Sequence, residues 1–470
     1  MPGRDRVLFR GGTVISMDPA YPDEWVADVL VEGENIVEIA PSITVDAASC
    51  EIFPAETKVV LPGLIDTHRH IWQAPLRYCG TDWGLEHYSE VILTRGGPAF
   101  TADDHYVAVR LGLAEALDAG ITQLFDWNHN INSPEHADAA VRAHTNAKMR
   151  IIFGYGQSVL TWREAVTSDD GLSKTMPSED VRRVQAQYYS SSDSLRTLAL
   201  AARGPEISTM GVVSAELAQA RELGLRVSIH VGNGERGPRF RPIAMMNEAG
   251  LLGDDITWVH CNSLADAELR LIAESGGSAS VASELEMHMG HGHPAVSRLV
   301  ANGIRPSLSV DTCANVSGDL FAVMRMTLAA ARADWNDRVL ADLPVGQRLE
   351  TRDVLEFATL QGAAANGLAR STGSISVGKK ADLLVIGTDR PNLLPLNYAT
   401  GAVVMGAHPG NVEAVMVNGE FLKRDYALVG IDIEHLRRRA NTLRDKLFER
   451  MGAHVGRWMP LSHQHAEMES

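Results

Sequence analysis

The chain has 470 residues, of which 45% are hydrophobic, and a formal net charge of −16 at pH 7. This length exceeds one compact domain of ordinary size, and it predicts a barrel-sized domain with a smaller one. The negative charge would repel phosphate backbones, which argues against nucleic acid as a partner. No apolar run approaches the roughly 20 residues of a membrane helix, so we expect no membrane association and a cytoplasmic location. The four cysteines form no CxxC pair, which predicts reduced thiols.

Short strand patterns occur at both ends of the chain. Residues 1–60 contain "RVLFRGGTVIS" and "ADVLVEGENIVEIAP", and residues 371–430 contain "GSISVGKKADLLVIG" and "VEAVMVNGEFLKR". A piece of two or three strands is marginally stable alone. We therefore expect both segments to form one small composite β-sandwich domain, followed by a helical tail over residues 431–470.

Between these ends, residues 61–370 alternate compact apolar runs with segments of helical periodicity. This alternation is typical of repeated βα units around a parallel sheet. The pattern predicts an α/β fold with a (β/α)8 TIM-type barrel. Eight runs are the expected barrel strands, at residues 58–68, 120–128, 149–156, 195–205, 225–233, 256–262, 277–283 and 304–312.

Polar residues stand at the ends of several predicted strands. His68 and His70 end the first strand, His230 the fifth, His260 the sixth and Asp311 the eighth. In an extended chain His68 and His70 point to the same side, about 7 Å apart. Imidazoles and a carboxylate at one barrel mouth would suit Zn²⁺ or Fe²⁺ with an open position for water. A single histidine at a strand end is more often a hydrogen-bonded loop residue, but their joint placement favours a metal site.

Several motifs carry a resemblance to a known family. The stretches "LPGLIDTHRH", "IHVGN", "WVHCN", "LSVD" and "GSISVGKKADLLVI" resemble the amidohydrolase superfamily, in particular its cytosine, guanine and triazine deaminases. The resemblance implies one divalent metal ion per chain. Zn²⁺ is the first candidate for this ion and Fe²⁺ the second. It also implies a small-molecule substrate and a homo-oligomer, a dimer or larger.

The same resemblance implies roles for individual residues. The metal would be held by His68, His70, His230 and Asp311, with His260 beside the metal-bound water or the substrate. Asp311 would act as the base while metal-bound hydroxide attacks an sp² carbon.

The sequence departs from this pattern after the fifth strand. Relatives usually carry Glu three residues after the histidine, as a proton shuttle, whereas this chain has Asn233. Asparagine cannot transfer a proton at neutral pH. Glu235 is our candidate replacement from a Gly-flanked loop, although it could be a solvated loop carboxylate. Otherwise another group does this work, or the reaction does not need it. Asn233 itself stays a candidate for substrate binding.

Other candidates for substrate binding follow the seventh and first strands. In the predicted loop "SELEMHMGHGHPAV" these are Glu284, Glu286 and His288, which could also be solvated or bind stray metal, whereas His291 and His293 are expected to be structural. After the first strand, the Gln73 amide could bind a heterocycle edge. Trp72 or Trp83 could stack on the ring, with core packing as the alternative.

The remaining candidates are weaker. Arg203, after the fourth strand, could contact an anionic or carbonyl-bearing substrate or pair with a neighbouring acid. Cys261 and Cys313 should pack against the barrel wall because they alternate with His260 and Asp311. The second and third strands end near further pocket candidates, Asp126, Trp127, His129 and Gln157.

These residues predict a metal-dependent hydrolytic deaminase acting on an amino-substituted nitrogen heterocycle: a purine, a pyrimidine or a triazine. The alternative within enzymes is cleavage of a cyclic or linear amide, or dechlorination of a triazine, by the same metal centre. Outside enzymes, the protein could be a binding or assembly member that lost turnover, as Asn233 would allow. The full set of metal ligands argues against this last hypothesis.

Overall fold

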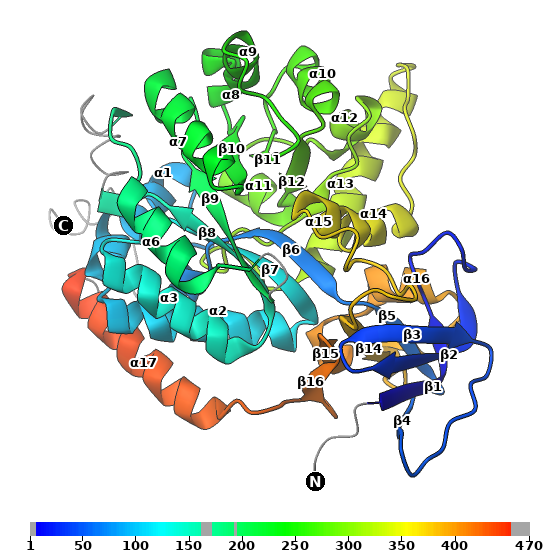
Figure 1. Cartoon of the computed structure of the whole chain (residues 1–470). Helices are drawn as coiled ribbons and strands as arrows, with labels where there is room; N and C mark the ends of the chain where they lie inside the picture. The colour runs from blue at the N-terminus through cyan, green and yellow to red at the C-terminus, as the bar shows by residue number, and fades with distance from the viewer. Residues whose placement is uncertain (1–5, 161–171, 192–194, 453–470) are drawn as a thin grey trace, which may run out of the picture.

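The barrel strands follow one another in chain order around one of the two sheets, which has eight strands (Figure 1). The computed structural model describes residues 6–160, 172–191 and 195–452. Each predicted run contains one barrel strand, so the predicted (β/α)8 barrel is confirmed. The strands are β6 (Leu64–Arg69), β7 (Ile121–Asn128), β8 (Arg150–Gly156), β9 (Arg196–Ala202), β10 (Arg226–Val231), β11 (Ile256–His260), β12 (Ser278–Val281) and β13 (Ser307–Leu308).

The barrel closes where its first strand meets the segment after its last strand. The Asp311 amide donates to the His68 carbonyl at 3.0 Å, and the His70 amide donates to the Asp311 carbonyl at 2.7 Å. Deeper in the barrel, the Thr67 hydroxyl lies 2.7 Å from the Ser280 hydroxyl and 2.8 Å from that of Ser307. The closure thus places two histidines and an aspartate side by side.

Helices cover the outside of the barrel (Figure 1). The helix α2 begins where it does because Thr101 and Asp104 form a capping box, in which each side chain accepts a hydrogen bond from the other's amide. The main helices are α2 (Ala102–Asp118), α3 (Pro134–Ala147), α6 (Ser178–Tyr188), α7 (Met210–Glu222), α8 (Arg236–Phe240), α9 (Pro242–Glu248), α10 (Asp266–Ser275), α11 (Ser283–Met289), α12 (Val296–Ala301), α13 (Leu320–Leu340), α14 (Thr351–Phe357) and α15 (Leu360–Ala365).

Strands from both chain ends form the second sheet, as predicted. Its order is β17-β16-β15-β14-β5-β1-β2-β3, with β4 beside β1, so β5 and β14 join the two halves. Its core contains Phe9, Val29 and Val385. The strands are β1 (Arg6–Val14), β2 (Trp25–Glu32), β3 (Asn35–Ala40), β4 (Glu51–Pro54), β5 (Lys58–Pro62), β14 (Leu383–Gly387), β15 (Val412–Val417), β16 (Glu420–Arg424) and β17 (Ala427–Leu428).

Two contacts fix this sheet against the barrel. Gly63 alone separates β5 from β6, and a Cβ there would lie 2.1 Å from Thr122 Cγ2, so glycine is required. Arg150, at the start of β8, donates to Asp382 from Nε at 2.7 Å and from Nη2 at 3.1 Å. Both side chains are buried.

The C-terminal helix α17 (Ile433–Arg450) returns along the barrel beside α2 (Figure 1). It buries Leu443, Leu447 and Phe448 in a cluster with Val107 of α2. The rest of the predicted tail, residues 453–470, lies outside the described residues. Within the described ranges, no helix is both long enough and apolar enough to cross a membrane.

Asp382→Asn should destabilise the fold, because it leaves the Arg150 guanidinium buried without its countercharge. Removing one partner of a buried ion pair costs about 3–5 kcal/mol, so we expect a lower urea midpoint in circular dichroism. The matched control is Glu222→Gln, which breaks the exposed pair with Arg182 and should leave the midpoint nearly unchanged. Equal midpoints for the two variants would contradict the role of the Arg150–Asp382 pair.

Candidate active site

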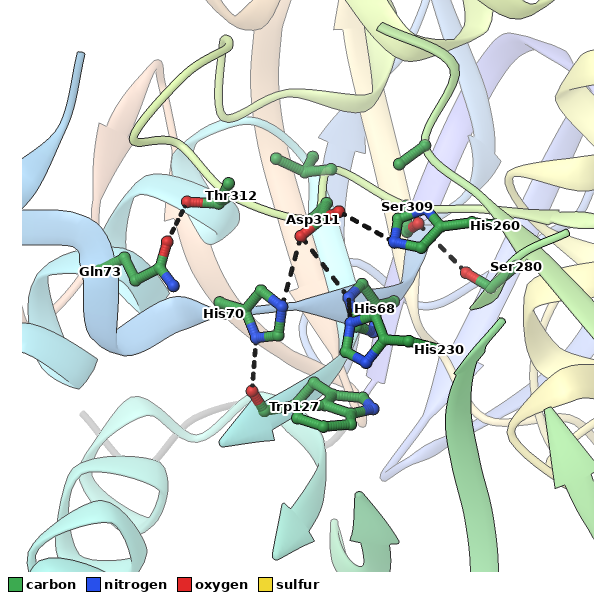
Figure 2. Close-up of polar contacts among 12 residues, drawn as sticks. His68, His70, Gln73, Trp127, His230, His260, Ser280, Ser309, Asp311 and Thr312 are labelled. Atoms are coloured by element: carbon green, nitrogen blue, oxygen red, sulfur yellow. Dashed lines mark hydrogen bonds and ion pairs between the residues drawn. The ribbon is translucent and has the colours of Figure 1, made fainter. Parts of the chain in front are cut away.

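Five side chains converge at the carboxyl end of the barrel (Figure 2). His68 and His70 come from the end of β6, His230 from β10, His260 from β11 and Asp311 from the segment after β13. The Nε2 atoms of His68 and His230 are 3.2 Å apart. Asp311 Oδ1 lies 3.6 Å from His68 Nε2 and 3.4 Å from His70 Nε2, while Asp311 Oδ2 lies 3.4 Å from His260 Nε2. The predicted metal ligands are thus brought together.

The protonation of these groups suits a divalent cation. Burial lowers the pKa of His68 to about 3 and lowers the pKa values of His70 and His230 as well, so all three imidazoles are neutral at pH 7. Burial alone would raise the pKa of Asp311, but its hydrogen bond to His68 and its electrostatic interactions with the surrounding histidines lower it overall. Neutral imidazoles around an ionised carboxylate form a suitable donor set for Zn²⁺.

The contacts of His70 fix which of its nitrogens faces the centre. Its Nδ1 lies 2.9 Å from the carbonyl oxygen of Trp127. A carbonyl oxygen only accepts hydrogen bonds, so Nδ1 carries the hydrogen and Nε2 keeps its lone pair. Metal-ligating histidines are commonly oriented in this way.

His260 is held from behind by Glu286. Glu286 Oε1 lies 3.1 Å from His260 Nδ1 and accepts from the Ala282 amide at 2.8 Å, while Oε2 accepts from the Asn262 amide group at 3.2 Å. Burial alone would lower the pKa of His260, but the hydrogen bond to Glu286 and the charge of Asp311 raise it overall. Glu286, predicted to bind substrate, therefore lies behind His260 and outside the pocket lining.

A pocket opens beside these five residues. Its apolar wall comes largely from α1 (Leu85–Tyr88) and η2 (Ser89–Gly96), which contribute Leu85, Tyr88 and Leu93. Such a mixture of apolar surface and a few converging polar groups is typical of small-molecule sites. The polar lining residues are His70, Ser89, His129, Glu206, His230, Asn233, Arg236, His260, His291 and Asp311.

Asn233, at the usual shuttle position, and Glu235, its candidate replacement, lie in different environments. Asn233 is partly buried and lines the pocket, and its buried Oδ1 accepts no hydrogen bond within the described part of the chain. Glu235 directly precedes α8, is exposed and does not line the pocket.

Three further candidates after the first and fourth strands are buried but do not line the pocket. Gln73 donates to the Tyr88 hydroxyl at 2.6 Å. Its amide oxygen accepts from the Thr312 hydroxyl at 2.5 Å (Figure 2), so the amide is already used. Trp72 packs edge-on against Phe100. Arg203 donates to the Lys174 carbonyl at 2.5 Å.

The segment after β12 is a helix, α11, and not the predicted loop. Glu284 accepts from the Ser317 hydroxyl at 3.3 Å, and His288 is exposed and contacts the Thr81 carbonyl. Neither lines the pocket. Met289 and His291 do, although His291 was expected to be structural. Burial lowers the pKa of His291 to about 3, and its ring nitrogens have no hydrogen-bond partner among the described residues, which leaves them available to a ligand.

Among the weaker candidates, only His129 lines the pocket. Asp126 is buried against His144, whose Nε2 is 2.9 Å away. Gln157 donates to the Lys174 carbonyl at 2.7 Å. Trp83 is buried and lines no part of the pocket, which agrees with its core-packing alternative, and Cys261 and Cys313 are buried outside the pocket lining as well.

Sequence reasoning missed Glu206 and Arg236, which both line the pocket. Glu206 lies four residues beyond the end of β9, in "ARGPEIS". A carboxylate just past the end of a barrel strand was an available signal, because catalytic groups collect at this face.

The barrel and its histidine–aspartate centre define the class of metal-dependent hydrolases. Residues 59–422 match the sequence profile of the amidohydrolase family, and the chain belongs to that family. It is therefore a hydrolase acting on carbon–nitrogen bonds, as predicted.

Individual relatives agree with this class. The 5'-deoxyadenosine deaminase of Methanothermobacter thermautotrophicus is 25% identical, over 84% of this chain and 89% of its own. An adenosine deaminase from Xanthomonas campestris, solved with bound zinc, has a TM-score of 0.78 at 22% identity, covering 94% of this chain and 98% of its own. A triazine hydrolase variant has a TM-score of 0.82 at 20% identity, covering 93% and 99%. The name of the first relative agrees with the predicted deaminase activity on a nitrogen heterocycle, and the two solved structures share the fold of this chain.

Removing one ligand should empty the metal site. After dialysis, we expect about one equivalent of divalent metal per chain in the wild type and much less in His70→Ala. Inductively coupled plasma mass spectrometry measures the metal content. His288→Ala, which removes an exposed histidine outside the pocket, is the control and should keep the metal. Full metal content in His70→Ala would exclude His70 as a ligand.

Proposed function

We propose that this protein is a metal-dependent deaminase. It hydrolyses the C–N bond that joins the amino group to the ring of an adenosine-derived purine, and it releases ammonia. The observation that carries the proposal is the convergence of Asp311 with His68, His70 and His230 at a pocket mouth. The purine is supported by the 5'-deoxyadenosine and adenosine deaminases among its relatives.

We also propose that the resident ion is Zn²⁺, held by His68, His70, His230 and Asp311. The support is a set of nitrogen and oxygen donors with neutral imidazoles, together with the zinc bound to the related adenosine deaminase. When bound, such an ion lowers the pKa of a water molecule and supplies a nucleophile at neutral pH.

The remaining chemistry belongs to the chain. Asp311 accepts a proton from the attacking water, since its ionised carboxylate lines the pocket. His260, held by Glu286, presents Nε2 toward Asp311 Oδ2 and hydrogen-bonds the water or the oxygen on which negative charge develops. The apolar side chains of Leu85, Leu93 and Met289 exclude bulk water from the reacting carbon.

The proposal is tested by ammonia release from zinc-loaded protein. The compounds are 5'-deoxyadenosine, adenosine, aminopyrimidines and aminotriazines, and we expect the purine nucleosides to be the best substrates. Asp311→Asn should abolish release, because it removes both a ligand and the proton acceptor. If zinc-loaded wild type releases no ammonia from any compound, the deaminase proposal is wrong.

A further inference from the structure

Among the described residues, two carboxylates line the pocket, Asp311 and Glu206. Only Asp311 has a place in the chemistry described so far. Hydrolytic removal of an amino group needs more than one proton transfer, because the ring nitrogen gains a proton and the leaving amine must be protonated. A second acid–base group facing the substrate can share these transfers with Asp311.

A tight turn after β9 directs Glu206 into the barrel mouth. Gly204 has φ of 74°, and a Cβ there would lie 2.4 Å from Ile229 Cγ2, so the turn depends on glycine. The Ser208 hydroxyl donates to the Gly204 carbonyl at 2.6 Å and closes the turn. Glu206 follows Pro205 and is only 7% exposed.

One oxygen of Glu206 is anchored, and the other is not. Oε1 accepts from the Gly232 amide at 2.6 Å. Gly232 directly precedes Asn233 and follows His230 by two residues, so this bond fixes Glu206 beside the segment that carries both. Oε2 accepts no hydrogen bond from any residue in the described ranges, and it is not enclosed. A substrate in the pocket can therefore reach Oε2.

The surroundings of Glu206 suit a group that both gives and takes a proton at neutral pH. Burial raises the pKa of Glu206 to about 7, against the opposing effects of the Gly232 amide, Arg236 and His260, and with a further small rise from Glu268. Groups with a pKa near the working pH are the most effective general acids and bases. Two pocket carboxyls whose surroundings favour different protonation states point to different roles.

We propose that Glu206 is a catalytic residue, the proton donor and acceptor that serves the substrate's ring nitrogen and the departing group. This inference rests on the proposed deaminase function. Asn233 lies beside Glu206 in the pocket and cannot transfer a proton, whereas Glu235 lies outside the pocket.

The proton transfers balance over one turnover. Water forms a C–O bond to the amino-bearing carbon, losing one proton to Asp311, while the Glu206 carboxylic acid gives its proton to the adjacent ring nitrogen. The C–N bond to the amino group then breaks, and the amine leaves as ammonia with the proton from Asp311. The new hydroxyl returns its proton to Glu206 and becomes a carbonyl, so both carboxyls regain their starting states.

Glu206→Gln tests the proposal with little disturbance, because a glutamine Oε1 can still accept from the Gly232 amide. We expect kcat for ammonia release from the best substrate to fall at least about 100-fold, with KM little changed and full zinc content. In the wild type, kcat/KM should fall as the pH rises above about 7, because the acid form of Glu206 is lost. The residual activity of Glu206→Gln should lack this alkaline limb of the pH profile. Glu235→Gln should keep both the rate and the limb. Near-normal turnover in Glu206→Gln would overturn the proposal.

A second readout does not depend on turnover. Infrared spectra of zinc-loaded protein, titrated from about pH 5 to about pH 9, should contain a carboxylic acid band that titrates near pH 7 in wild type and is missing in Glu206→Gln. Burial also raises the pKa values of Asp66 and Glu216 to about 7, but their bands cancel in the difference between the two proteins.

The two readouts separate this inference from the proposed function. Normal ammonia release by Glu206→Gln rejects Glu206 while the deaminase function stands. If no compound releases ammonia from wild type, the proposed function fails and the infrared titration alone decides: the band supports Glu206 as a proton-transfer group, and its absence from the difference overturns it.

Discussion

The site depends on one backbone contact, the pairing of Asp311 with the strand that carries His68 and His70. Two hydrogen bonds, of 2.7 Å and 3.0 Å, close the barrel here. Asp311 adopts a positive φ of 66°, which a non-glycine residue rarely does, so its conformation is maintained by the surrounding contacts. Because the same residue closes the barrel and presents its carboxylate, barrel geometry and ligand geometry are set together.

A second layer of contacts orients the site around this closure. The Trp127 carbonyl sets the ring of His70, Glu286 sets the ring of His260, and the Gly232 amide holds Glu206. Each of these supports comes from a different strand end or helix start than the group it orients. The pocket is therefore a property of the whole barrel mouth, which explains why a preorganised site needs a complete barrel.

The barrel and the histidine–aspartate site could be predicted because the sequence pattern indicates where the strands end. Apolar runs locate the strands, His68 and His230 lie at the ends of two of them, and Asp311 follows the end of β13 by three residues. Side-chain partners were not predictable in this way. Gln73 is a suitable residue for binding a heterocycle, but Tyr88 and Thr312 use its amide, and these contacts join segments far apart in the chain. Glu206 lies four residues beyond β9, on a glycine-dependent turn, and it was missed although a carboxylate just past a barrel strand was an available signal.

The composite sheet also imposes an order on the making of the molecule. The central strand β5 lies between β1 and β14, and β14 begins only at Leu383. During synthesis from the N-terminus, one edge of β5 therefore has no neighbour until every strand of the barrel has been translated. An unpaired edge of Val59, Val60 and Leu61 favours pairing with other chains. The strand order thus leaves this edge of β5 without its native neighbour until residue 383 has been translated.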